Sequence, residues 1–337
     1  MKAGNIRDEL ESYASAVNEF ILSNLHGKPK ELYQASAHYI SSGGKRLRPF
    51  MVIKSAEMFG ADIKRALPAA ACIELVHNFT LVHDDIMDND DLRHGVPTVH
   101  KCYGMPLAIL SGDILFSKAF QILVIHGRKS GIADKAISDI VSRVATACIN
   151  ICEGQAIDVD VSSSSKFPSE SQYISMIGKK TASLFEASCA LGALSAPSHR
   201  TGTDDVINLA SFGRNIGIAF QLVDDLIGVI GDTKLTGKAV GNDIREGKKT
   251  YPILLALKNS KNDDRDKILK VFGSKSASSS DLREAVRVIS DIGIDDAVRS
   301  AAREYMDEAL KWIEEYDDSP AKRALQSSAN FVVERSL

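Results

Sequence analysis

Residues 81–95, LVHDDIMDNDDLRHG, gather five aspartates directly behind an apolar run. If positions 66–88 form one helix, Asp84 and Asp88 share a face at i and i+4, and Asp85 lies beside them. Two carboxylates roughly 6 Å apart repel each other by about 3 kcal/mol at an effective dielectric near 20. Something cationic must offset this repulsion.

A second acidic motif lies in FQLVDDLIGVIGD, residues 220–232, where Asp224 and Asp225 follow another apolar run. Hard divalent cations take oxygen ligands, and Mg²⁺ in particular is held by a few carboxylates together with substrate phosphates. Two facing helices that carry these carboxylates would make a clamp for Mg²⁺ and a diphosphate.

Basic residues cluster in turns beside these motifs. GGKRLRP at 43–49 combines a glycine pair, which lets backbone approach an anion closely, with Lys45 and Arg48 before a proline-started helix. The other members of this set follow the first acidic motif, lie in KKT, or lie in the Gly-punctuated segment TGKAVGNDIREGKK: Arg93, Lys180 with Thr181, Lys238 and Lys248. Together they suit a site for two diphosphates.

Apolar residues recur at 3.6-residue spacing nearly throughout, without a convincing run of alternating strand residues. The pattern predicts an all-α protein, with one helical domain over residues 1–337. Expected helices cover about 4–25, 31–41, 47–59, 66–88, 104–127, 131–160, 169–195, 203–231, 250–272, 279–291, 295–313 and 318–334.

Composition limits the classes of function. Of 337 residues, 44% are hydrophobic and 25% charged, and the net charge is −3, so neither a polyanion binder nor a nucleic-acid binder is indicated. We see no leader sequence and no stretch approaching 18 apolar residues, and we expect a cytoplasmic protein without a membrane span. Five cysteines without a CxxC pair are expected to be small core residues.

Seven motifs in one order, GGKRLRP, DDIMD, RHG, EGQAIDVD, KKTASLF, FQLVDDL and GKAVGNDIREGKK, resemble the trans-isoprenyl diphosphate synthases, the polyprenyl synthetase family. A lone DDxxD motif is weak evidence, but this combination over about residues 40–250 is specific. The resemblance implies an isoprenoid-synthase-type bundle around a deep apolar cavity, a homodimer, and head-to-tail transfer of an allylic diphosphate to isopentenyl diphosphate.

The resemblance also implies roles for individual residues. Three Mg²⁺ ions would be borne by Asp84, Asp88, Asp158 and Asp224, with Asp85 and Asp225 nearby. The allylic diphosphate would be held by Arg93, Lys180 and Lys238, and the isopentenyl diphosphate by Lys45, Arg48 and His77. Oxygens of Lys180, Thr181 and Gln221 would steady the carbocation, and Lys248 would close over the site.

Two positions depart from the family pattern. Gly228 stands where the second motif usually has its third aspartate, and His94 stands where an arginine usually grips isopentenyl diphosphate. A neutral imidazole lacks arginine's bidentate fork, although a bound diphosphate would favour its charged form. We therefore expect a Michaelis constant for isopentenyl diphosphate that changes between pH 6 and 8.

Product length depends, by the same resemblance, on the residues one turn before the first motif, Phe79 and Thr80. A single aromatic at 79 implies a twenty-carbon product, geranylgeranyl diphosphate, with farnesyl diphosphate as the alternative. Phe79 also fits an ordinary core position.

Three other functions fit parts of the sequence. A terpene cyclase shares aspartate-rich helices but should lack GGKRLRP. A non-catalytic partner subunit of a synthase would explain Gly228 and His94, whereas the intact DDIMD and Lys180 favour activity. An acidic surface protein without a small-molecule function should not be stabilised by Mg²⁺ and diphosphate.

Overall fold

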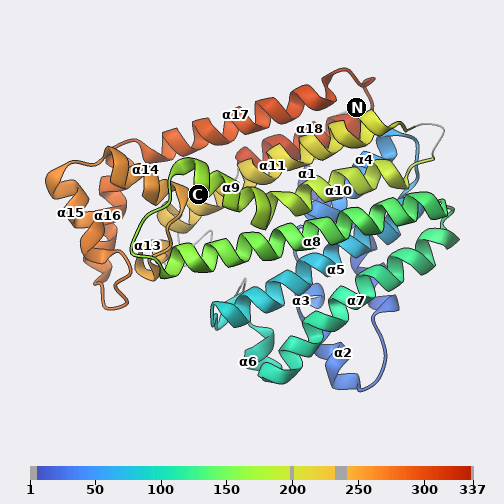
Figure 1. Cartoon of the computed structure of the whole chain (residues 1–337), viewed down its shortest axis with the longest axis horizontal. Helices are drawn as coiled ribbons and strands as arrows, with labels where there is room; N and C mark the ends of the chain where they lie inside the picture. Colours follow the sequence, from blue (N-terminus) through green and yellow to red (C-terminus); the bar gives the residue numbers. More distant parts are fainter. Residues whose placement is uncertain (1–5, 94, 198–200, 232–240, 335–337) are drawn as a thin grey trace. The chain divides into compact units, whose positions relative to one another are not determined.

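The protein is helical in the computed structural model, which describes residues 6–93, 95–197, 201–231 and 241–334 (Figure 1). The helices of the first half of the chain are α1 (Ile6–Asn24), α2 (Lys30–Ser36), α3 (His38–Ser41), α4 (Leu47–Met58), α5 (Ile63–Met87), α6 (Val99–Tyr103), α7 (Met105–Lys129) and α8 (Asp134–Ser163). Those that follow are α9 (Glu170–Ile177), α10 (Ser183–Ser195), α11 (Thr203–Ile230), α13 (Asn242–Glu246), α14 (Tyr251–Asn259), α15 (Asn262–Val271), α16 (Ser279–Asp291), α17 (Ile294–Glu314) and α18 (Pro320–Val333). The all-α prediction is confirmed.

The exceptions to α-helix are short. Two-residue strands β1 (Leu92–Arg93) and β2 (Val96–Pro97) pair antiparallel, directly after the first aspartate motif. The expected helix over 169–195 contains a π-helical turn, η1 (Gly178–Ala182), between α9 and α10. Such turns are rare and are frequently found at functional sites. Here the turn coincides with the KKT motif.

Two expected helices are divided, and two short ones were missed. The helix expected over 31–41 breaks at Ala37, and the one expected over 250–272 breaks at Ser260 and Lys261, whose backbone is extended. Helices α6 and α13 have five residues each, too few for an apolar repeat to show in the sequence.

The chain divides into two compact units, which we describe separately. Unit 1 comprises Met1–Cys148, Leu184–Gly213 and Trp312–Ser328, and unit 2 comprises Ile149–Ser183, Arg214–Lys311 and Ala329–Leu337. The single-domain organisation inferred from the sequence stays a prediction.

In unit 1, α5 is buried from Ala66 to Val76 almost without interruption, and the residues of this stretch are apolar except for Glu74. Its first turn is capped by Asp62, whose side chain accepts a hydrogen bond from the Arg65 N–H at 2.9 Å. Helices α5 and α7 run side by side (Figure 1). The approach is close, because a Cβ at Gly112 would lie 2.2 Å from His83 Nε2.

In unit 2, the C-terminal half of α11 buries Val223, Leu226 and Val229, so the DDLIG motif stands on a core helix. Helix α9 begins with a capping box between Ser169 and Gln172, which satisfies two backbone donors at once. These two helices carry the groups that surround the second acidic motif.

Two helices have a high mean hydropathy, although polar residues such as Asp113 and Lys118 interrupt the apolar run of α7. Both α7 and α11 are long and apolar enough to cross a membrane by length and composition alone, with 39% and 61% of their apolar windows buried inside the structure. Core helices of soluble proteins pass the same test. The cysteine prediction holds for three of five residues, since Cys102 and Cys152 are exposed.

Candidate active site

The first acidic motif lies at the end of α5, and its aspartates have different surroundings. Asp85 is fully buried, accepts a hydrogen bond from the Tyr39 hydroxyl, and accepts another from Arg93 Nε at 2.6 Å. Asp84 is half-buried and Asp88, the C-cap residue of α5, is exposed. Asp85 therefore fixes the helix end, while Asp84 and Asp88 are left accessible to ligands.

Tyr39 ties this helix end to the segment that follows it. Its hydroxyl oxygen accepts a hydrogen bond from the Val99 N–H at 3.3 Å, and the Thr98 hydroxyl donates to the Asp90 carbonyl at 2.8 Å. Burial, followed by the hydrogen bond to Asp85, raises the pKa of Tyr39. The hydroxyl therefore keeps its proton and remains a donor to Asp85.

The GGKRLRP turn is shaped by Arg46, a residue that sequence reasoning passed over. Arg46 has a left-handed backbone (φ 47°), and its Nη1 lies 2.7 Å from Glu74 Oε1 in a buried ion pair. The anchored turn leaves Lys45 exposed and starts α4 so that Arg48 Nη1 lies 3.3 Å from His77 Nε2. Two of the three residues expected to hold isopentenyl diphosphate thus lie together.

The second acidic motif repeats the layout of the first. Asp225 is buried, accepts a hydrogen bond from the Tyr173 hydroxyl, and accepts another from Gln221 Nε2 at 2.9 Å, whereas Asp224 is exposed. Burial raises the pKa of Asp225 to about 8, although the bonds from Tyr173 and Gln221 lower it; the charges of Asp243 and Asp224 raise it further.

The π-helical turn η1 brings together the other residues expected to act in unit 2. Lys180 Nζ lies 2.5 Å from Asp158 Oδ2, and the Thr181 hydroxyl donates to Gln221 Oε1 at 2.7 Å. Gly154 of the EGQ motif allows this approach, because a Cβ there would lie 2.4 Å from the Lys180 backbone nitrogen. The glycine therefore serves to admit η1 against α8.

Lys248 lies beyond the C-terminal end of α13. Its Nζ is 2.7 Å from Glu246 Oε2 and 3.8 Å from Asp243 Oδ1. Lys238 and His94, both expected to bind diphosphate, lie outside the described residues. Their assignments stay predictions.

Phe79 faces α7. Its ring centroid is 4.8 Å from that of His83 and 5.2 Å from that of Phe116, and Phe116 in turn contacts Phe120. The Thr80 hydroxyl donates to the His77 carbonyl at 2.8 Å and is thereby satisfied within its own helix. Phe79 is thus part of a cluster of aromatic rings in tilted and edge-to-face contact between α5 and α7.

Sequence reasoning missed the tyrosines that bind the buried aspartates. Tyr39 precedes Asp85 by 46 residues, and Tyr173 precedes Asp225 by 52. No local spacing rule connects residues so far apart, so only the folded chain reveals these pairs.

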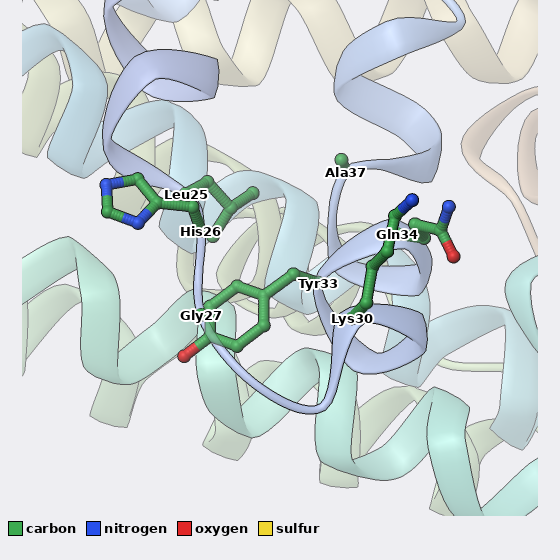
Figure 2. A pocket seen from close by; sticks show the side chains of 7 residues that line it. All are labelled: Leu25, His26, Gly27, Lys30, Tyr33, Gln34 and Ala37. Atoms are coloured by element: carbon green, nitrogen blue, oxygen red, sulfur yellow. The ribbon is translucent and has the colours of Figure 1, made fainter.

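A separate cavity of about 280 Å³ opens in unit 1 where α1 leads into α2 (Figure 2). The Tyr33 ring lies against Gly27, where an added Cβ would be 2.3 Å from the ring. The cavity is lined by Leu25, His26, Gly27, Lys30, Tyr33, Gln34 and Ala37. None of the residues expected to bind diphosphate or metal lines it.

The accessible carboxylates suit a hard cation that completes its shell with other ligands. Within the described ranges, no three acidic, histidine or cysteine side chains gather closely enough to hold an ion by themselves. Mg²⁺ is usually bound by one or two carboxylates plus waters and substrate phosphates, and so needs no such cage.

Comparison with known proteins identifies the family. The model of the family described as polyprenyl synthetase matches residues 29–289. The chain belongs to the polyprenyl synthetase family. A geranylgeranyl diphosphate synthase of Sulfolobus acidocaldarius is 43% identical over 95% of this chain and 96% of its own length.

Solved structures of the polyprenyl synthetase family share the whole fold. The geranylgeranyl pyrophosphate synthetase of Pyrococcus horikoshii Ot3 matches with a TM-score of 0.89 and 37% identity, covering 98% of each chain. A polyprenyl synthase of Caulobacter crescentus CB15, complexed with calcium and isoprenyl diphosphate, matches with a TM-score of 0.86 and 32% identity over the full length of both chains. Members of this family thus bind divalent metal together with an isoprenyl diphosphate.

Proposed function

We propose that this trans-prenyltransferase condenses isopentenyl diphosphate head-to-tail with dimethylallyl, geranyl or farnesyl diphosphate to give a short-chain all-trans prenyl diphosphate. One observation supports this most directly. In both acidic motifs the leading aspartate, Asp84 or Asp224, is accessible, while the next aspartate is buried and fixed by a tyrosine. Such an arrangement presents a metal ligand on a rigid support.

The metal ions are assigned to four carboxylates, with three Mg²⁺ ions in each site. The donor set fits, because it consists of carboxylate oxygens with room for water and phosphate. Mg²⁺, when bound, would neutralise the charge that develops on the leaving diphosphate. The proposed ligands are Asp84, Asp88, Asp158 and Asp224.

Basic residues are assigned to the two diphosphates. Arg48 and His77 are 3.3 Å apart and would bind isopentenyl diphosphate together with the exposed Lys45. The allylic diphosphate is assigned to Arg93, Lys180 and Lys238, with Lys248 closing over it. Lys180 and Asp158 are already paired, so a metal ligand and a phosphate ligand are adjacent.

Carbocation stabilisation is assigned to the group around η1. The Thr181 hydroxyl donates a hydrogen bond to Gln221 Oε1, so its oxygen lone pairs are available to a neighbouring cation. Gln221 is held at its other end by Asp225. Fixed dipoles of this kind stabilise charge without reorganising during the reaction. The released diphosphate takes the proton that the condensation product loses.

The main product is assigned as geranylgeranyl diphosphate. The name of the Sulfolobus acidocaldarius relative supports this length. So does the contact between the Phe79 and Phe116 rings, which places bulky aromatic groups one turn before the first motif. Replacing the ring by Phe79→Ser should lengthen the product, whereas an unchanged product would place the chain-length limit elsewhere.

The protein is further proposed to be a cytoplasmic homodimer built on single-domain subunits. Helix α7 exposes several large apolar side chains that a second copy would cover: Met105, Ile109, Leu110 and Ile125. The family match supports the single domain, since residues 29–289 include parts of both units. Sedimentation of the purified protein tests the assembly.

The reaction is tested by incubating the pure protein with Mg²⁺, labelled isopentenyl diphosphate and each allylic diphosphate in turn, followed by chromatography of the dephosphorylated alcohols. A twenty-carbon alcohol is expected. A fifteen-carbon alcohol would keep the reaction and replace geranylgeranyl by farnesyl diphosphate as the product. No product from a folded protein would favour the non-catalytic partner subunit that Gly228 and His94 suggested.

A further inference from the structure

Gly228 lies on α11 one turn after Asp224, where the second motif of the family usually has another aspartate. A Cβ built at this position would lie 2.0 Å from Asp243 Oδ2 and 2.7 Å from its Cγ. Real Cβ atoms do not approach other atoms so closely. The Asp243 carboxylate therefore occupies the space that any side chain at 228 would need.

Asp243 is held in this place by its backbone. It lies in the first turn of α13, which is entered through Gly241 and left through Gly247, both with positive φ (71° and 72°). The Asp243 carbonyl accepts a hydrogen bond from the Lys248 N–H at 2.9 Å, and the following residue, Ile244, is completely buried. The short helix thus presents the carboxylate to α11 from a fixed support.

The Asp243 carboxylate also lies near the aspartates of the second motif. Residues 224 and 228 share a helix face at i and i+4, so a group in the space beside Gly228 lies on the Asp224 side of α11. Asp225, the residue after Asp224 on α11, is buried as well. Asp243 itself is only 7% exposed. Buried carboxylates are usually paired with cations or coordinate metals. Lys248 Nζ lies 3.8 Å from Asp243 Oδ1, and a metal ion bound beside Asp224 would be a second cation near this carboxylate.

We propose that Asp243 supplies the third carboxylate of the second acidic motif, and that Gly228 is required because a side chain there would displace it. The inference rests on the proposed Mg²⁺–diphosphate chemistry and assigns two further residues to that site. The apparent loss in DDLIG is then an exchange of one carboxylate for another from α13.

The proposal predicts the effects of particular substitutions at Gly228 and Asp243. Gly228→Ala adds only a methyl group, yet it must push the Asp243 carboxylate aside, so it should resemble Asp243→Asn. Gly228→Asp brings a second carboxylate into occupied space and should also impair the site. The double substitution Gly228→Asp with Asp243→Gly moves the carboxylate onto α11 and empties the space on α13.

The experiment measures melting temperature against Mg²⁺ concentration in the presence of inorganic diphosphate, which reports binding without turnover. Both Gly228→Ala and Asp243→Asn should raise the Mg²⁺ midpoint by about 10- to 100-fold, in the range seen when groups supporting a metal site are removed. Their combination should add little to either one. The double exchange should recover most of the wild-type midpoint.

Asp266→Asn removes an exposed carboxylate of α15 and serves as the matched control with an unchanged midpoint. A wild-type midpoint in Asp243→Asn would overturn the inference, as would full additivity of Gly228→Ala and Asp243→Asn. Failure of the proposed function gives a different result: the wild-type protein itself would show no stabilisation by Mg²⁺ and diphosphate. Circular dichroism without Mg²⁺ verifies that each variant folds.

Discussion

The two acidic motifs have the same local design but balance their buried charge differently. In unit 1 the buried Asp85 accepts from Tyr39 and from the charged guanidinium of Arg93. In unit 2 the buried Asp225 accepts from Tyr173 and from the neutral amide of Gln221. The buried carboxylate of the first motif is therefore paired with a cation, whereas these two donors to Asp225 are neutral.

The consequence is visible in the second motif. Burial raises the pKa of Asp225 to about 8, and the carboxylates of Asp243 and Asp224 add to the effect. A bound cation would relieve this crowding, because an opposite charge nearby favours the ionised form. We therefore expect the proposed Mg²⁺ to offset more buried negative charge at the second motif than at the first.

The largest expected effect is a loss of kcat when either accessible aspartate, Asp84 or Asp224, is replaced. Asp84→Asn and Asp224→Asn each remove a proposed metal ligand, and we expect kcat to fall by roughly 100-fold or more, as when a single transition-state contact is lost. Their melting temperatures without Mg²⁺ should stay near that of wild type, since neither side chain is buried. Steady-state kinetics with the control Asp266→Asn tests this; a variant that retains full kcat would remove its aspartate from the metal site.

The buried aspartates should respond in opposite ways. Asp85→Asn removes the carboxylate that is paired with Arg93 and should lower the free energy of unfolding by about 1–3 kcal/mol at pH 7. Asp225→Asn removes a carboxylate that burial disfavours, and in chelator-treated protein it should be neutral or stabilising at pH 8 and above. Urea unfolding of both variants measures their free energies of unfolding. Equal destabilisation of the two variants would contradict the proposed difference between the motifs.

The same contrast predicts a pH dependence. The pKa of Asp225 rises from its ordinary value of 3.8 to about 8 in the folded protein, so between these values the folded state holds a proton that the unfolded state has lost. Metal-free wild-type protein should therefore lose stability as pH rises through this window. Asp225→Asn should show a flatter profile of melting temperature from pH 5 to 8; parallel profiles would argue against the raised pKa.

The last comparison concerns the tyrosines. Tyr39→Phe and Tyr173→Phe each remove one hydroxyl donor from a buried carboxylate, at an expected cost of about 1–3 kcal/mol. Tyr173→Phe should in addition raise the Mg²⁺ concentration needed for half-maximal rate, because Asp225 supports Gln221. If both variants lost only stability, the tyrosines would have no role in positioning the site.

The sequence by itself determined the helical fold and indicated residue pairs that the structure places in contact. Period-3.6 patterning located α5 and α11, because helices that bury apolar faces must repeat them along the chain. Adjacent motifs supplied Arg48 with His77 and Thr181 with Gln221, and the structure places both pairs in contact.

Tertiary structure alone decided which aspartate of each motif is buried and what stands beside Gly228. Tyr39, Tyr173 and Asp243 contact their partners from other helices. No repeating pattern along the sequence indicates which residues these partners are. The physical reason is that burial and charge balance depend on groups brought together in space. Helix periodicity depends only on neighbours along the chain, and for that reason the sequence could specify it.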